Sequence, residues 1–106
     1  MLEVEIREQE VREKFARYMD DFAARYNVPA RLIRLITMEQ IYREWAAHPT
    51  LPLLWAEMEL AGKTDTPEDF MGYLVSRAEW GDPELRSAAE QTLERLYARM
   101  EQGLQN

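Results

Sequence analysis

Apolar residues return at helical spacing along most of the chain, with charged residues between them. The clearest stripe falls within residues 11–26, where Glu and Arg fill the remaining positions. Its members are Val11, Phe15, Tyr18, Met19, Phe22 and Tyr26. A period of about 3.6 residues is typical of an amphipathic helix that buries one face. The pattern therefore predicts a first helix over residues 11–26.

The first residues of the chain follow a different pattern. Leu2, Val4 and Ile6 alternate with charged residues, and a period of two is typical of a half-buried strand. A lone strand in a helical protein needs a partner strand to pair its backbone. We expect residues 2–7 to form the irregular start of the first helix, and a short N-terminal extended segment is the alternative.

A second helix is predicted from Pro29 to Ala47, after the break at Asn27-Val28-Pro29. Asn tolerates the left-handed conformation that ends helices, and Pro fits the first turn of the next one. Apolar residues cover most of this helix's circumference: Leu32, Ile33, Leu35, Ile36, Met38, Ile41, Tyr42 and Trp45. A helix with this pattern is either central in its fold or covered by another subunit.

Three further helices follow, each bounded by residues that start or stop helices. Proline disfavours helical geometry in the residue before it, so the stretch from His48 to Pro52 interrupts the chain. The helices expected after it span about 52–61, 67–80 and 83–103, started or ended by Gly62, Thr66-Pro67, Gly81, Asp82-Pro83 and Gly103. The expected fold class is all-α: a compact bundle of about five helices in a single domain over residues 1–106.

Composition narrows the chemistry open to this domain. A chain of 106 residues with no Cys and one His has no disulfide, no thiolate nucleophile and almost no transition-metal site. Its neighbouring carboxylates lack the His residues of a di-iron bundle, and Gly62-Lys63-Thr64 lacks the rest of a phosphate loop. We therefore expect no catalytic residue, no metal and no cofactor, and a helix-end or surface role for His48.

The net charge of -7 is unevenly distributed. Residues 25–48 carry four Arg against two Glu, whereas the segments on both sides are acidic. A surface that attracts anions must therefore lie in this middle segment. No apolar run approaches the roughly 20 residues of a membrane span, and the start of the chain lacks the pattern of a secretory signal. We expect a cytoplasmic protein without a membrane partner.

The segment 22–36 resembles a helix-turn-helix. Ala23 is a small residue that lets two helices pack closely, and Asn27 can form the turn four positions later. Val28, Ile33 and Ile36 are the apolar residues that hold the two helices together. The resemblance implies a DNA-binding regulator that reads DNA through residues 25–43.

Arg25, Arg31 and Arg34 are the candidate DNA contacts under this hypothesis. Two features argue against DNA binding. Leu32 and Leu35 occupy the positions that would face the groove, where polar side chains are needed. The net negative charge of the chain also repels phosphate. An ordinary corner between two helices and a corner used for protein docking are the other interpretations.

The aromatic content favours a different function. Three Trp, five Tyr and six Met are many for a small domain, and these residue types are enriched at interface hot spots. Tyr42, Trp45, Leu51 and Trp55 are the candidate partner-binding residues. We predict a non-enzymatic acidic interaction protein: an adaptor, regulator or assembly subunit that binds a protein partner or itself, or an inhibitor that presents carboxylates to a basic partner. Nucleic acid is the alternative partner.

Overall fold

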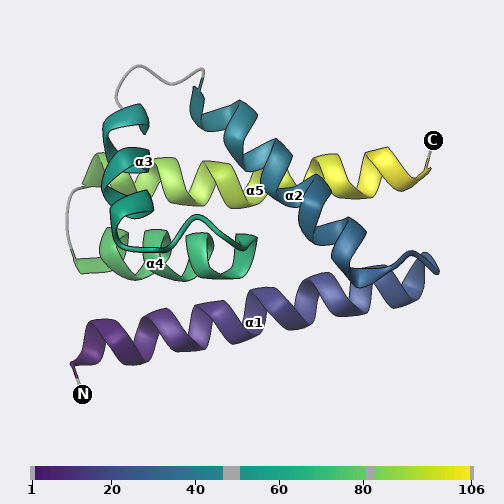
Figure 1. Ribbon diagram of the computed structural model, residues 1–106, viewed down its shortest axis with the longest axis horizontal. Coiled ribbons are helices and arrows are strands. Elements are labelled where there is room, and N and C mark those ends of the chain that lie inside the picture. Colours follow the sequence, from purple (N-terminus) through teal and green to yellow (C-terminus); the bar gives the residue numbers. More distant parts are fainter. Residues whose placement is uncertain (1, 47–50, 81–82, 106) are drawn as a thin grey trace.

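Five α-helices form a bundle in the computed structural model (Figure 1), which describes residues 2–46, 51–80 and 83–105. The helices are α1 Glu3–Arg25, α2 Ala30–Ala46, α3 Leu51–Leu60, α4 Pro67–Trp80 and α5 Pro83–Gln105. The described ranges contain no strand. The prediction of an all-α bundle of about five helices is confirmed. His48, Gly81 and Asp82 lie outside the described residues.

The N-terminal residues are helical, so the alternative of an extended segment over residues 2–7 is wrong. Helix α1 begins at Glu3, and the Leu2 N–H donates to Glu5 Oε2 at 3.3 Å. Two acidic residues in the first turn also favour the positive end of the helix. A helix satisfies its backbone hydrogen bonds internally, whereas no strand is present in the described part of the chain to pair an extended segment.

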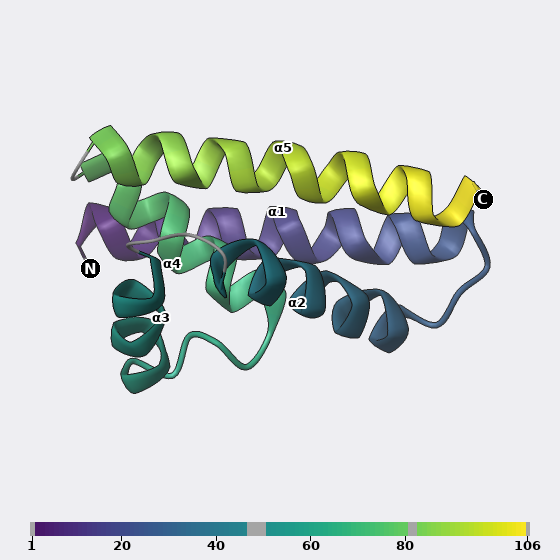
Figure 2. The same cartoon turned by 90° about the horizontal axis from the view of Figure 1, so that it is seen from above.

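Helices α1 and α5 run in the same direction, and α4 runs in the opposite direction (Figure 1). Helices α2 and α3 both lie on one side of this group (Figure 2). Aromatic rings join α1 to α5, with the ring centroids of Tyr18 and Tyr97 4.3 Å apart. This arrangement leaves one side of α2 turned away from the other helices.

The core is built from apolar side chains of all five helices. The largest fully buried apolar side chains are Met19, Ile33, Ile41, Trp45, Met58, Phe70, Met71, Leu74 and Leu96. Phe15 and Phe22 are also buried, which confirms the stripe of residues 11–26. The rings of Trp45 and Phe70 pack edge to face, with centroids 4.8 Å apart.

Helices α1 and α4 pack closely at Gly72. A Cβ atom added there would lie 2.8 Å from the carbonyl oxygen of Glu8 and 3.2 Å from the Cβ of Arg12. Real Cβ atoms almost never come within 3.0 Å of a heavy atom from a residue that is not adjacent in the chain. Only glycine therefore allows this spacing between the two helices.

A tight turn at Asn27 sets the direction of α2. Asn27 has a φ of 55°, its N–H donates to the Ala24 carbonyl at 3.2 Å, and the Val28 N–H donates to the Ala23 carbonyl at 2.9 Å. These two bonds form a Schellman motif with a left-handed residue at its centre. The expectations for Asn27, and for Gly62 at the end of α3 with a φ of 72°, are confirmed.

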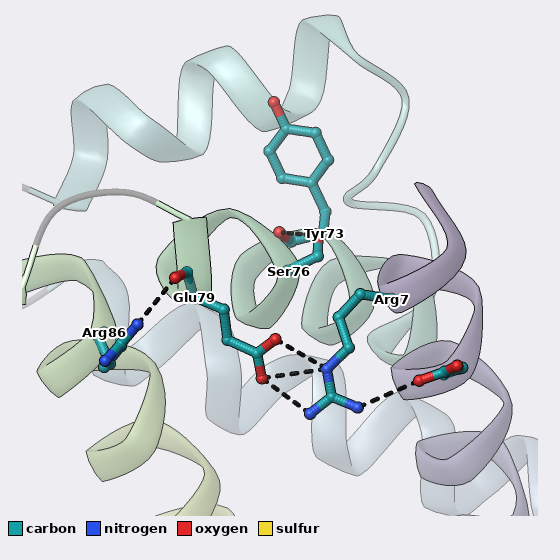
Figure 3. A network of polar contacts seen from close by, with 6 residues as sticks. Arg7, Tyr73, Ser76, Glu79 and Arg86 are labelled. Atoms are coloured by element: carbon teal, nitrogen blue, oxygen red, sulfur yellow. Dashed lines mark hydrogen bonds and ion pairs between the residues drawn. The ribbon is translucent and has the colours of Figure 1, made fainter. Parts of the chain in front are cut away.

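An ionic cluster closes the end of the bundle where α1 begins and α4 ends (Figure 3). Arg7 donates from Nε and Nη2 to the Glu79 carboxylate at 2.8 to 3.0 Å. Arg86 of α5 donates to the Glu79 carbonyl oxygen at 2.8 Å. The hydrogen bonds from Arg7 hold the pKa of Glu79 below its ordinary value. The cluster joins the three helices α1, α4 and α5.

Candidate functional site

Helix α2 has one buried face and one exposed apolar face. Ile33, Thr37, Ile41 and Trp45 are buried. On the opposite side the exposed fractions are 42% for Leu32, 66% for Leu35, 37% for Ile36 and 57% for Tyr42. Successive residues are rotated by about 100° around the helix axis. Glu39 and Arg43 therefore lie on the same side of α2 as these four apolar residues. We call Leu32, Leu35, Ile36, Glu39, Tyr42 and Arg43 the α2 outer face.

Exposed apolar side chains are concentrated on this face. Seven large apolar residues are exposed among those described, and four of them belong to the α2 outer face. The other three are Leu2 and Ile6 near the start of α1 and Leu60 at the end of α3. Single exposed apolar residues are ordinary, but a contiguous group marks an interaction surface.

A pocket adjoins this face between α2 and α3. It has a volume of about 220 Å³ and is lined by Tyr42, Trp45, Ala46 and Trp55. The rings of Tyr42 and Trp55 meet edge to face, with centroids 5.5 Å apart. Aromatic walls of this kind accept an apolar or aromatic side chain. We call these four residues the aromatic pocket.

The structure brings together three of the four candidate partner-binding residues. Tyr42 is exposed, Trp55 is half-buried and Trp45 is 1% exposed. Trp45 is buried because it lies on the inward face of α2 and packs against Phe70. Trp45 forms a wall of the aromatic pocket. The side chain of Leu51 lies outside the described part.

The charges around the α2 outer face are few and mixed. Arg43 donates to Glu39 Oε1 at 2.6 Å, one turn apart along the helix. Arg31 is exposed at the edge of the face, and it makes no ion pair with any side chain that the structure describes. Among the described side chains, this face therefore offers apolar surface with one uncompensated cation and no carboxylate cluster.

Two of the three candidate DNA contacts already bind carboxylates. Arg25 forms an ion pair with Glu101 of α5. Arg34 donates to Asp20 of α1 at 2.8 Å and to Glu68 of α4 at 2.8 Å. Hydrogen bonds to Asp20 and Glu68 raise the pKa of Arg34 above its ordinary value, against the effect of burial. Arg25 and Arg34 join helices within the bundle, and Arg31 alone of the three stays uncompensated among the described side chains.

The corner between α1 and α2 matches most of the helix-turn-helix pattern. Ala23 and Ile33 are buried, and Val28 packs against the core, as the resemblance implies. Ile36 is exposed, so the expectation that it holds the two helices together is wrong. Leu32 and Leu35 are exposed, and they present apolar surface where a DNA-reading helix would present polar groups.

Sequence reasoning did not select Leu32, Leu35 and Ile36 as partner-binding residues. The sequence pattern of α2 could have identified them. A helix that is apolar nearly all round leaves some apolar residues exposed unless other elements surround it completely. Sequence reasoning also missed Glu68, whose Oε1 is buried and has no hydrogen-bond partner among the described residues. Its other carboxylate oxygen accepts from Arg34.

Within the described residues, no group of three or more His, Asp or Glu side chains is placed to hold a metal ion. No described helix is both long enough and apolar enough to cross a membrane. Comparison of the chain with models of protein families, with curated proteins and with solved structures finds no match.

Proposed function

We propose that this chain is a non-enzymatic interaction protein of the cytoplasm, an adaptor, regulator or assembly subunit that docks another protein chain. The docking surface is the α2 outer face together with the aromatic pocket. The observation that carries the proposal is the concentration of four exposed large apolar side chains on one helix face. Burial of such a side chain stabilises a complex by about 1.5–3 kcal/mol when it is complete.

The aromatic pocket supports the same proposal. Interface hot spots are enriched in Trp and Tyr, and they lie in pockets that exclude water from the partner's side chain. Tyr42 belongs both to the pocket and to the α2 outer face. A partner helix or loop that covers Leu35 is therefore able to place an apolar side chain in the aromatic pocket.

An inhibitor with a carboxylate surface for a basic partner has less support. On the α2 outer face such a surface would need unpaired acids together, but Glu39 there is paired with Arg43. Apolar contact is the stronger interaction that this face offers. The proposal therefore assigns recognition to Leu32, Leu35, Ile36 and Tyr42.

Capture of binding proteins from a cell lysate tests the proposed function. Leu35→Glu places a charge at the centre of the α2 outer face and should abolish recovery of the partner. Leu2→Glu is the matched control, because Leu2 is 69% exposed, Leu35 is 66% exposed, and Leu2 precedes α1. Circular dichroism should show that both variants fold. Equal recovery by the wild type and both variants would overturn the proposal.

A further inference from the structure

We infer that the partner on the α2 outer face is a second copy of this chain, packed about a two-fold axis that passes near Leu35 and Ile36. The inference rests on the proposed function and names its partner. It follows from the distribution of charge among the helices and from the order of residues along α2.

Charge favours α2 as the place where two copies meet. The chain carries a net charge of -7, so two copies repel each other over most of their surfaces. Helix α2 has three Arg against two Glu, whereas each of the other four helices has more acidic than basic residues. Like-charge contact is disfavoured at interfaces, and α2 is the helix at which a second copy meets the least repulsion.

The order of residues along α2 selects an antiparallel arrangement. Parallel packing of two α2 helices would place Arg31 against the partner's Arg31 and Glu39 against the partner's Glu39. Antiparallel packing centred between Leu35 and Ile36 places Leu35 against the partner's Ile36. A two-fold axis repeats every contact, because both copies use the same surface.

The same register brings opposite charges together. Arg31 and Glu39 lie about 5–7 Å along the helix on opposite sides of the centre, given a rise of about 1.5 Å per residue. Arg31 therefore lies within reach of the partner's Glu39, and the symmetric pair forms on the other side. Glu39 Oε1 accepts from Arg43, which leaves Oε2 to accept from the partner's Arg31. The apolar centre is thus flanked by two ion pairs between the copies.

Sedimentation of the purified chain from micromolar to millimolar concentration tests the inference. The wild type should show a monomer–dimer equilibrium. Leu35→Glu should raise the dissociation constant at least about tenfold, because it buries an unpaired charge at the interface centre. Leu2→Glu should leave the dissociation constant unchanged. A wild type that stays monomeric, or a Leu35→Glu variant that dimerises like the wild type, would overturn the inference.

A charge exchange tests the register separately from the apolar contact. Arg31→Glu and Glu39→Arg should each raise the dissociation constant roughly two- to fivefold, the range of exposed ion pairs. The double variant restores opposite charges across the axis and should return to within about twofold of the wild type. A double variant that dimerises no better than the single variants would refute this register.

The two proposals fail in different ways. A monomeric wild type, together with lysate capture that depends on Leu35, would overturn the second copy as partner and leave the docking function supported. Dimerisation that Leu35→Glu does not weaken, together with lysate capture that ignores Leu35, would overturn both. Dimerisation and capture that both depend on Leu35 support both.

Discussion

At the scale of single residues, Gly72 determines how closely α1 and α4 pack. We expect Gly72→Ala to lower the free energy of unfolding by about 1–3 kcal/mol, the usual cost of an overpacked contact. The added Cβ meets the Glu8 carbonyl oxygen at 2.8 Å, and a backbone atom inside a helix cannot rotate away. Urea unfolding followed by circular dichroism measures the change. Alanine is a better helix former than glycine, so a more stable variant would show that α1 moves aside at little cost.

Gly62→Ala is the matched control for that substitution. Nothing lies within 4 Å of a Cβ added at Gly62, but the residue has a φ of +72°. Gly62→Ala should therefore lower the free energy of unfolding by about 1–2 kcal/mol, through the strained backbone conformation alone. Gly62 could be assigned from the sequence, because glycine after a helix is a common stop signal. Gly72 could not, because its role depends on where another helix passes.

At the scale of helices, Arg7 and Glu79 join the start of α1 to the end of α4 (Figure 3). Their side chains are 41% and 37% exposed, so solvent screening limits the pair to about 0.5–1 kcal/mol. Arg7 lowers the pKa of Glu79 from its ordinary 4.5. The stabilisation is therefore complete above that value and is lost as the pH falls through the lowered pKa of the folded state.

We expect Arg7→Ala to destabilise the protein by about 0.5–1 kcal/mol at pH 7 and by close to nothing at a pH below the lowered pKa of Glu79. Urea unfolding at both pH values measures the difference. Arg17→Ala is the matched control, because Arg17 is exposed and has no ion pair with the described side chains. An Arg7→Ala effect that persists unchanged at low pH would show that the pair with Glu79 is not its cause.

Helix α2 shows how far a helix pattern predicts a site. Its apolar circumference predicted a helix that is either central in the fold or covered by another subunit. The structure shows Ile41 and Trp45 buried and Leu35 exposed. In a helix with one polar face, the sequence predicts which side faces solvent. Helix α2 has apolar residues on both sides, so its sequence does not predict this. Its orientation depends on which side packs against Phe70 and the rest of the core, and that information is not local to α2.

At the scale of the whole molecule, charge argues against DNA as the partner. We expect no saturable binding of duplex DNA at low salt, because the net charge is -7 and Arg25 and Arg34 already bind carboxylates. Fluorescence anisotropy at low ionic strength is the sensitive measurement, since phosphate attraction is then strongest. Binding that disappears in the Arg31→Ala/Arg34→Ala variant would contradict this prediction and favour the helix-turn-helix hypothesis.

The amino-acid sequence alone determined the all-α class, the approximate bounds of most helices and the absence of Cys. These properties depend on local spacing and residue type, as in the stripe through Phe15 and Phe22 or the turn at Asn27. The pairing of Arg34 with Glu68, the burial of Trp45 and the exposure of Leu35 required the folded chain. Each depends on which helices become neighbours, because burial and ion pairing are properties of surfaces that meet across long sequence separations.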